Sequence, residues 1–320
     1  MEESYYTDKR RRRVKLIFNS SSGKAKDSPG QLMDVISQMQ AWKLMPEVYL
    51  LEPDSDLPMM ASDTLVQGIT MFVACGGDGT VSAVSKAIAG LPVTLGIIPT
   101  GTQNNIALSL GIPIDMPASI AILRMGKRIK IDLGLLTYGD IKTTFLELCT
   151  VGLTSSIFPA ADDIQHGHLE KIGEFLSTLI TSSPSDIKLL LDNKHEISSA
   201  GHAVLISNMP YVGRHYRVGH PRSFQDGFLD VLFFGDLSKL NLIGYAITKF
   251  DMNEIDNPHI WNFKVHSVDI STSPPIPVMV DGLVLGEGPV HVEIMRRALG
   301  VMTAAPIKKV VTENRGIPTK

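Results

Sequence analysis

Two glycine-rich segments contain the residues of this chain that are best suited to chemistry. One reads GGDGT and comprises Gly76, Gly77, Asp78, Gly79 and Thr80; the other reads PTGTQNN, from Pro99 to Asn105. Backbone N–H groups at the start of a helix bind phosphate oxygens, and glycine lets a phosphate approach because it has no Cβ atom. The two segments therefore predict that the chain binds the phosphate groups of a nucleotide.

Each glycine-rich segment lies between a predicted strand and a predicted helix. The run from Ile69 to Ala74 is apolar without alternation, as in a strand covered on both faces, and Thr80 to Ala89 then has helical spacing. Val93 to Ile98 predicts the next strand, and a helix is expected from Asn104 to about Leu110. Both segments are therefore expected at one edge of a parallel sheet, each at the start of a helix.

A third unit precedes these two. Val14 to Phe18 predicts a strand, and Asn19, three serines, Gly23 and Lys24 follow it. Ligands of open parallel sheets bind beyond the carboxyl ends of the strands, so the three loops are expected to converge. Any one loop could be a simple turn, whereas all three together favour a site. The chain has no GxGxxG after its first strand and no complete Walker loop, which disfavours a dehydrogenase and a P-loop NTPase.

An ordered set of motifs extends along nearly the whole chain, from about Val14 to Ala304. NSSSGK, GGDGT and GIIPTGTQNNIALSLGIP are followed by IDLG at Ile131 to Gly134, DGFLDV at Asp226 to Val231 and VDG at Val280 to Gly282. In this order the sequence resembles the diacylglycerol kinase catalytic family, which includes bacterial lipid kinases and sphingosine kinases. GGDGT alone also suits NAD kinases, so a kinase of that type with a soluble substrate is a weaker alternative.

The resemblance implies a fold, a reaction and a set of site residues. The fold joins a Rossmann-like three-layer α/β nucleotide domain to an antiparallel β-sandwich, with the active site in the cleft between them. The reaction transfers the γ-phosphoryl group of ATP to a lipid hydroxyl in the presence of Mg²⁺. Asp281 would be the catalytic base and Asp78 a second catalytic carboxylate. The residues implied to line the ATP site are Asn19, Gly76, Gly77, Asp78, Gly79, Thr80, Thr100, Gly101, Thr102 and Asn104.

The chain departs from the usual family pattern at several positions. Ala83 stands in place of an acidic residue, and Asn105 stands in place of Asp. Leu283 replaces the Glu of a DGE motif, and that Glu is expected to help hold the metal. Glu287, four residues further on, is a hypothetical substitute as a metal ligand. Glu147 stands where many members have Asn, which resembles one bacterial branch of the family.

Asp226, in the motif QDGFLDV, is a second candidate metal ligand. The resemblance implies this role, because the same motif holds a structural metal in some relatives. A carboxylate with neighbouring carbonyl groups would form the oxygen-rich shell that Mg²⁺ prefers. The alternative is an Asp-Gly turn before a strand, and it is favoured because Asp-Gly is a common turn signal.

The composition is that of an ordinary globular protein. The 320 residues are 44% hydrophobic and 20% charged, which is enough for two domains with large cores and excludes disorder as the main state. No segment has the pattern of a membrane span or a signal peptide. The two cysteines, Cys75 and Cys149, form no metal or disulfide pattern and are expected to be buried. A cytoplasmic location is therefore expected.

The charge pattern limits the choice of partners. The net charge of −3 argues against a general polyanion binder, and nucleic-acid binding is disfavoured because no aromatic or further basic stripe is present. One basic cluster could hold the enzyme at the anionic inner membrane surface, where each basic residue contributes on the order of 1 kcal/mol. The alternative is that these basic residues form a solvated tail before the first strand. The cluster consists of Lys9, Arg10, Arg11, Arg12 and Arg13.

The pattern of elements changes near Lys130. Residues 1–130 alternate strands with helices such as Gly30 to Trp42 and Ala118 to Met125, which predicts a parallel α/β sheet. Residues 131–297 contain mostly short strands, as in a β-sandwich, with helical segments at Phe158 to Thr181 and Ser238 to Phe250, and the resemblance implies that this domain binds the lipid substrate. The expected strands are Leu133 to Thr137, Thr143 to Val151, Asp186 to Leu191, Ala203 to Ser207, Leu229 to Phe234, Phe263 to Ser271, Val278 to Val280 and Val290 to Met295. The resemblance implies that residues 298–320 return to the first domain, and an edge strand of the sandwich would let two copies pair as a homodimer.

Two functions from different classes remain. The first is an ATP- and Mg²⁺-dependent lipid kinase that acts on the hydroxyl of a lipid such as diacylglycerol or a sphingoid base. The second is a non-catalytic relative that binds lipid or nucleotide, and Ala83, Asn105 and Leu283 favour it. The kinase is preferred, because loss of the base would be the simplest way to lose phosphoryl transfer and Asp281 is present.

Overall fold

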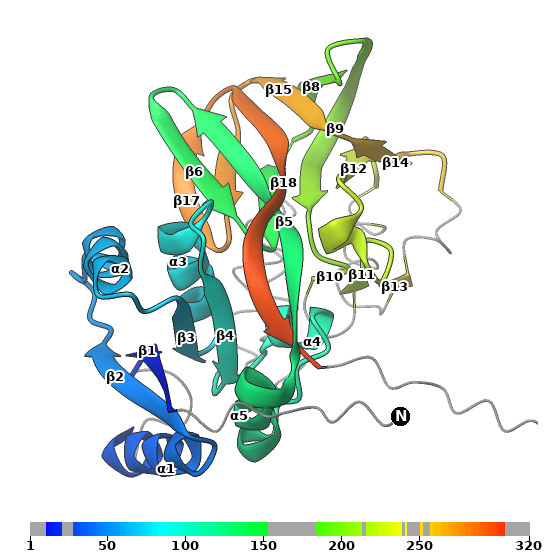
Figure 1. Cartoon of the computed structure of the whole chain (residues 1–320). Coiled ribbons are helices and arrows are strands. Elements are labelled where there is room, and N and C mark those ends of the chain that lie inside the picture. Colours follow the sequence, from blue (N-terminus) through cyan, green and yellow to red (C-terminus); the bar gives the residue numbers. More distant parts are fainter. Residues whose placement is uncertain are drawn as a thin grey trace, which may run out of the picture.

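A computed structural model describes residues 11–20, 28–152, 183–212, 216–238, 241, 250–251 and 257–304. Its first part alternates strands and helices, as predicted, and Figure 1 shows them in blue to green. The strands are β1 (Arg12–Phe18), β2 (Leu44–Leu50), β3 (Met71–Gly76) and β4 (Thr94–Pro99). The helices are α1 (Ser28–Ala41), α2 (Leu57–Val66), α3 (Asp78–Ile88), α4 (Asn105–Ser109) and α5 (Met116–Met125).

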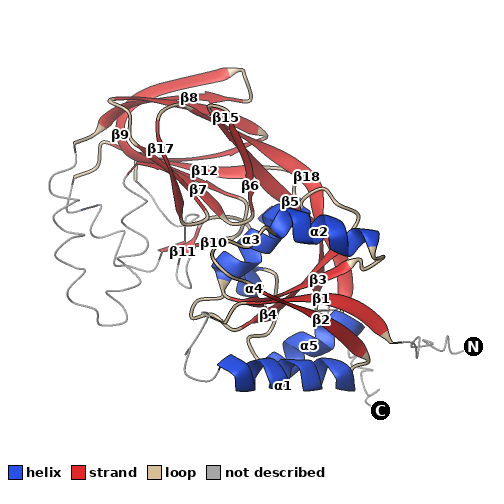
Figure 2. Cartoon of the chain, turned by 90° about the vertical axis from the view of Figure 1, so that its left-hand side faces the viewer, coloured by secondary structure: helices blue, strands red, loops and turns tan. Residues whose placement is uncertain are grey.

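The four strands form a parallel sheet in the order β2-β1-β3-β4. Every residue of β3 and β4 is buried, because helices cover both faces of the sheet. In Figure 2, α1 and α5 lie on one side and α2 and α3 on the other. Each face therefore has its own apolar core, and the sheet separates the two.

Two elements of this first part were not predicted from the sequence. Strand β2 is an edge strand that contains Pro46 and Glu47, residues that a central strand would not accommodate. Helix α2 is amphipathic only weakly, but its start has ordinary signals. The Asp56 carboxylate accepts a hydrogen bond from Met59 N at 2.9 Å, and a proline lies in the first turn.

The second part consists of strands. Their bounds are β5 (Lys127–Tyr138), β6 (Ile141–Phe145), β7 (Leu148–Gly152), β8 (Ser185–Leu191), β9 (His195–Ser207), β12 (Leu229–Gly235), β14 (Ile260–Val265), β15 (Ser267–Ser273), β16 (Pro277–Val280), β17 (Leu283–Glu287) and β18 (Val290–Thr303). A 3₁₀ turn, Ser223–Gln225, precedes β12. A small separate sheet contains β10 (Tyr211–Val212), β11 (Tyr216–Arg217) and β13 (Phe250–Asp251).

Strand β18 connects the two parts. It pairs antiparallel with β15 and β5, and near its end Gly300 and Val301 pair in parallel with β4. One hydrogen-bonded sheet of 15 strands therefore runs from β17 in the sandwich to β2 in the α/β part. In Figure 1, β18 and β5 cross the middle of the molecule side by side. The fold is an α/β domain followed by a β-sandwich domain, which confirms the predicted fold class.

Two predicted strands are each divided in two. At each break, backbone N–H groups donate to the carboxylate of a different aspartate. The predicted strand from Thr143 to Val151 is interrupted between β6 and β7, where backbone N–H groups turn toward the carboxylate of Asp281. The predicted strand from Phe263 to Ser271 is interrupted at His266, where the N–H groups of His266 and Ser267 donate to Asp192 at 2.7 and 2.9 Å. Strand β17 was not predicted. The predicted helix Phe158 to Thr181 and nearly all of Ser238 to Phe250 lie outside the described residues.

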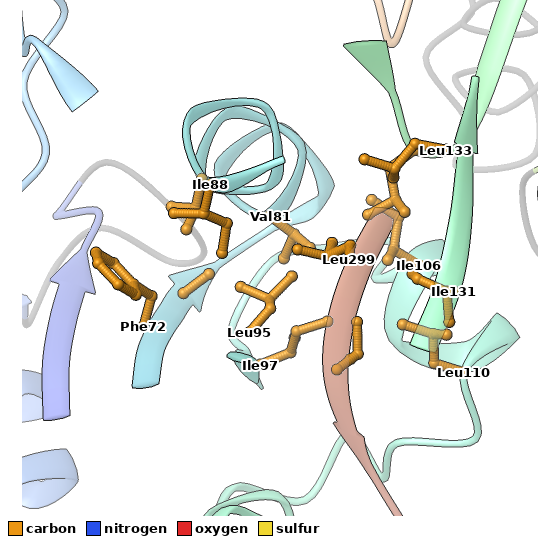
Figure 3. Packing of buried hydrophobic residues seen from close by; sticks show 14 of the residues in the cluster. Phe72, Val81, Ile88, Leu95, Ile97, Ile106, Leu110, Ile131, Leu133 and Leu299 are labelled. Atoms are coloured by element: carbon orange, nitrogen blue, oxygen red, sulfur yellow. The ribbon is translucent and has the colours of Figure 1, made fainter. Parts of the chain in front are cut away.

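An apolar core joins the two domains. Figure 3 shows Val81 of α3 and Leu95 of β4 packed with Leu299 of β18 and Ile131 of β5. All four side chains are at most 2% exposed. Burial of large aliphatic side chains stabilises a fold by roughly 1.5–3 kcal/mol each. The start of α3, which carries GGDGT, is therefore held firmly against the strands that lead into the sandwich.

Candidate active site

The two glycine-rich loops lie against each other, backbone to backbone. A Cβ atom built on Gly101 would lie only 2.4 Å from Gly77 Cα, and one built on Gly77 would lie 3.3 Å from Gly101 Cα. The Thr100 N–H donates to the Gly76 carbonyl at 3.0 Å, which continues the pairing of β3 with β4 into the loops. The close contact requires glycine at residue 101.

The start of α3 is open to a ligand. Gly77 is the N-cap residue and has no side chain that could cap the helix. Gly79, in the first turn, is exposed, and a Cβ atom built on it would have no atom within 4 Å. Backbone N–H groups and the positive end of the helix dipole therefore face outward, an arrangement that binds phosphate.

Asp78, predicted as a catalytic carboxylate, fastens the second loop to the first. Its Oδ2 accepts a hydrogen bond from Asn105 N at 3.0 Å, and its Oδ1 accepts one from Ile106 N at 2.9 Å. Asp78 thus caps α4. Burial raises the pKa of Asp78, although the backbone hydrogen bonds oppose that rise. The carboxylate is committed to positioning the loop that contains Thr100, Gly101 and Thr102.

The two predicted asparagines also shape the loops. Asn104 has a left-handed backbone with a φ of 56°, and its buried side chain bonds Gly101 N at 3.0 Å and Gly101 O at 2.7 Å. Asn19, after β1, donates through Nδ2 to Thr80 Oγ1 at 2.9 Å. The structure therefore brings all the predicted ATP-site residues to the ends of β1, β3 and β4, with Gly79 and Thr102 the most exposed of them.

The sandwich contributes Asp281 to the same place. Asp281 lies in the tight turn between β16 and β17, with left-handed φ values of 42° for Asp281 and 84° for Gly282. Its Oδ2 accepts hydrogen bonds from Ser82 Oγ of α3 and from Leu146 N at 3.1 Å. Its Oδ1 accepts two more, from Glu147 N and Leu148 N, each at 3.1 Å. Four donors from two domains therefore hold this carboxylate one helical turn from the phosphate loop.

Glu147 is a residue of this site for which no role was predicted from the sequence. It lies at the break between β6 and β7, its side chain hydrogen-bonds with that of Asn105, and it is close to Asp78 and Asp281. Burial, together with the charges of these two aspartates, raises the pKa of Glu147 well above its usual range. The signal available in the sequence was the acidic residue itself.

The two predicted metal ligands lie apart from this cluster and from each other. Glu287 is exposed at the far end of β17, where its carbonyl accepts a hydrogen bond from Tyr138 OH at 2.9 Å. Asp226 forms an ion pair with Lys264. Within the ranges that the structure describes, no group of three or more His, Cys, Asp or Glu side chains is arranged to hold a metal ion. These residues do not fit the metal role that the sequence assigned to them.

The predicted basic cluster divides into residues with different environments. Arg11 is exposed before β1, whereas Arg12 is half-buried within β1 and Arg13 donates to Glu47 at 2.6 Å. Lys9 and Arg10 lie outside the described residues. In the described part of the chain, no helix is long and apolar enough to cross a membrane.

Both cysteines are buried, as predicted. Burial raises the pKa of the Cys75 thiol to about 12, despite a hydrogen bond with Thr100, and it also raises the pKa of Cys149. The two thiols are therefore inert packing groups of β3 and β7 at neutral pH.

Two family models match successive parts of the chain. Residues 13–136 match the diacylglycerol kinase catalytic domain, and residues 150–303 match the YegS C-terminal NAD kinase beta sandwich-like domain. The two matches correspond to the α/β part and the sandwich. The chain belongs to the diacylglycerol kinase family. This family of lipid kinases is the one that the ordered motifs indicated.

Individual relatives agree with this assignment. The diacylglycerol kinase of Staphylococcus carnosus is 24% identical over 306 residues, which cover 93% of this chain and 97% of that protein. An uncharacterized protein of Synechocystis, sll0036, is 27% identical over 252 residues, and the chain spans only 56% of its length. The crystal structure of a diacylglycerol kinase from Bacillus anthracis has a TM-score of 0.71 at 20% identity, covering 92% of this chain and 97% of that one. The structural likeness supports the fold.

Proposed function

We propose that this protein is an ATP- and Mg²⁺-dependent lipid kinase that transfers the γ-phosphoryl group of ATP to a hydroxyl group of diacylglycerol, a sphingoid base or a similar lipid. The observation that carries the proposal is the hydrogen bond from Ser82 Oγ to Asp281. This bond brings Asp281 of the sandwich within one helical turn of the phosphate loop of α3. The Asp281 side of the site would bind the lipid hydroxyl and is called the acceptor side. A phosphoryl donor and an acceptor hydroxyl would therefore meet at one place.

On the donor side, the chain would bind ATP through backbone groups. The open N-terminus of α3 and the loop held by Asp78 and Asn104 present N–H groups to the phosphates. Because these loops are fixed by their own contacts, they lose little freedom when ATP binds. Phosphoryl transfer depends largely on such positioning and on electrostatic stabilisation.

On the acceptor side, a lipid hydroxyl oxygen would form a bond to the γ-phosphorus while the bond from that phosphorus to the bridging oxygen of ADP breaks. The hydroxyl proton must pass to a carboxylate late in this step. Asp281 was predicted to accept it, but four hydrogen-bond donors hold both of its carboxylate oxygens, which suits Asp281 to positioning. Glu147 lies close to Asp78 and Asp281, and burial and the charges of these aspartates raise its pKa, so its carboxylate binds a proton more readily and we assign it the proton-accepting role.

A lipid would reach these carboxylates beside an apolar surface. Leu283 and Val284, which directly follow the Asp281 turn, are 59% and 60% exposed. Exposed aliphatic side chains next to a site are suited to contact acyl chains or the membrane surface that contains them. Leu283, which replaces an acidic residue of the family motif, would thus make the entrance more apolar.

Mg²⁺ would supply charge neutralisation at the transferring phosphoryl group. Kinases often hold this ion chiefly through substrate phosphates and one or two carboxylates, without a dedicated protein site. Asp226 and Glu287 do not fit such a site, as described above. We therefore assign the ion to the bound nucleotide and derive no step from a protein-held metal.

The proposal is tested by phosphate transfer from labelled ATP to diacylglycerol, monoacylglycerol, sphingosine and ceramide in mixed micelles, with NAD as a soluble control. The native chain should phosphorylate one of the lipids. Glu147→Gln should lower kcat strongly with little change in the KM for ATP, and Asp281→Asn should lower both activity and stability. ATP or lipid binding without transfer to any lipid would instead favour the non-catalytic relative, and transfer to NAD would favour the soluble-substrate kinase.

A further inference from the structure

In the Asp226 turn, each oxygen of the Asp226 carboxylate has a hydrogen-bond partner. Asp226 Oδ1 accepts a hydrogen bond from Phe228 N at 3.0 Å, which closes the turn onto its own backbone. Asp226 Oδ2 is bonded to the ammonium group of Lys264, which reaches it from β14. Both oxygens that could coordinate a metal ion therefore already have partners.

A second carboxylate faces the same ammonium group. Asp230, on β12, lies opposite Lys264 in the antiparallel pairing of β12 with β14. Its Oδ1 is 3.8 Å from Lys264 Nζ, and the residue is only 3% exposed. Its Oδ2 is buried without a hydrogen-bond partner within the described ranges, beneath Gly219, where an added Cβ atom would lie 2.5 Å away. The site thus contains two carboxylates, one deeply buried, and one cation.

The charge of the lysine is secured by these surroundings. Partial burial opposes ionisation, but the hydrogen bond to Asp226 and the charges of Asp230 and Asp226 raise the pKa of Lys264 overall. Burial raises the pKa of Asp230 to about 6, and the lysine opposes this rise. Removal of the ammonium group would leave the buried Asp230 without a compensating charge, which is costly in a protein interior.

The turn matters because it is connected to the catalytic carboxylates. Gly227 N donates to the buried Asp132 at 2.9 Å, and Gln225 Nε2 donates to the Lys130 carbonyl at 2.7 Å, so the turn docks on β5. Asn208 Nδ2 then bridges the carbonyls of Asp132 and Leu146, both at 3.0 Å. Leu146 N is one of the donors that hold Asp281.

We propose that the ammonium group of Lys264 is the built-in cation of the Asp226 turn, and that this chain holds the turn in place without a bound divalent metal. An ammonium ion is a compact positive charge with three donors, so it can satisfy two carboxylates at once. It would also repel a second cation at contact distance. This assignment differs from the metal role implied by the family motif, and it is independent of the reaction proposed above.

The test compares thermal unfolding of the metal-stripped full chain in EDTA and in millimolar Mg²⁺ or Mn²⁺. The native chain should unfold at the same temperature in both, and a Mn²⁺ titration should show no ion bound to the nucleotide-free protein. Lys264→Met should unfold about 2 °C or more below the native chain in EDTA and should recover with Mg²⁺ or Mn²⁺, because the carboxylates are then free to take the ion. Lys188→Met is the matched control, since Lys188 pairs with Glu196 at 2.9 Å on the exposed surface of the same sandwich.

A native chain that loses stability in EDTA, or that binds one Mn²⁺ ion that Asp226→Asn abolishes, would overturn the proposal. So would a Lys264→Met protein whose unfolding temperature does not respond to divalent ions, or one that is as stable as the native chain in EDTA. If Lys264→Met does not fold, the Mn²⁺ titration of the native chain and of Asp226→Asn decides between the two cations.

Discussion

The phosphate loops and the Asp281 turn lie at the same junction, but they are held in place by contacts of very different range. The loops are fixed by contacts within the α/β part, with separations from 3 residues for Asn104 on Gly101 to 61 residues for Asn19 on Thr80. Asp281 is fixed by Ser82 and Leu146, which are 199 and 135 residues away in the chain. The donor side of the site therefore forms within the α/β part, whereas the acceptor side also depends on a contact between the two domains.

Mutations are therefore expected to affect the two sides of the site differently. Damage that separates the two loops should abolish nucleotide binding, because their direct contact shapes the phosphate site. Damage to one of the four donors to Asp281 should weaken the acceptor side in steps, because three donors remain.

Gly101→Ala should cause the largest loss. The new Cβ atom would lie 2.4 Å from Gly77 Cα, and backbone atoms cannot move aside as a flexible side chain can. Overpacking of this kind costs about 3 kcal/mol and would separate the two phosphate loops. ATP binding, measured by titration calorimetry, should disappear, and the unfolding temperature should fall.

Gly79→Ala is the matched control for that substitution. The added Cβ atom has no neighbour within 4 Å, so the unfolding temperature should stay close to that of the native chain. Any loss of ATP affinity in this variant would then report the approach of phosphate to the start of α3. Equal destabilisation by the two substitutions would contradict the direct backbone contact between the loops.

Ser82→Ala should have an intermediate effect on the acceptor side. It removes the only side-chain donor to Asp281 among the described residues and leaves the three backbone donors in place. A hydrogen bond to a charged group contributes about 1.5–3 kcal/mol. Denaturant unfolding should show a loss of this order, and lipid phosphorylation should fall while ATP affinity remains.

Ser85→Ala provides the comparison on the same helix. Ser85 is also buried, but its hydroxyl donates to the Ser82 carbonyl within α3 at 2.7 Å and does not reach the sandwich. It should cost less stability and leave activity unchanged. If both serine variants lose activity equally, Asp281 is not positioned through Ser82.

The phosphate loops could be predicted from the sequence much better than the surroundings of Asp281. The strands and helices around GGDGT and PTGTQNN could be predicted because each motif is continuous and its glycines have a local reason. The break at Leu146 and Glu147 could not, because the apolar run continues through it and its cause, Asp281, lies far along the chain. The same holds for Lys264 and Asp226, which are 38 residues apart and meet only across paired strands.

The role of Asp78 shows a second limit of sequence reasoning. An acidic residue in a glycine-rich loop suggests chemistry, but hydrogen bonds to Asn105 and Ile106 use both of its oxygens for the loop itself. Glu147 presents the reverse case, since only the fold shows that it lies beside two aspartates. The residue type determines which roles a side chain could have. The hydrogen-bond partners of that side chain in the fold determine which of these roles remain open to it.

Glu147→Gln should stabilise the protein at high pH, with a smaller effect than the preceding variants. Its folded-state pKa is raised by burial and by two nearby carboxylates, so ionisation of Glu147 destabilises the folded state as the pH rises. Below the unfolded-state pKa the residue is protonated in both states and this penalty vanishes. The unfolding temperature of Glu147→Gln should therefore exceed that of the native chain at pH 8, and the difference should shrink toward pH 4.

Glu287→Gln serves as the control, because Glu287 is exposed at the other end of β17. Its unfolding temperature should follow that of the native chain across the same pH range. A Glu147→Gln protein that is less stable than the native chain at pH 8 would show that the glutamate stabilises the junction in its ionised form. That result would remove the basis for assigning the proton-accepting role to Glu147.

A small change in the dependence of activity on Mg²⁺ is expected from a substitution beside the Asp281 turn. Leu283 is 59% exposed, so Leu283→Glu can be accommodated without loss of packing and restores the acidic residue usual in the family motif. If that position faces the metal of the bound nucleotide, the Mg²⁺ concentration for half-maximal activity should decrease modestly. Glu287→Gln should leave it unchanged, because the residue lies at the far end of the strand, with its carbonyl bonded to Tyr138. If Glu287→Gln shifts the Mg²⁺ concentration for half-maximal activity and Leu283→Glu does not, the far end of β17 approaches the nucleotide. The acceptor side would then extend along the whole strand and would not be confined to its turn.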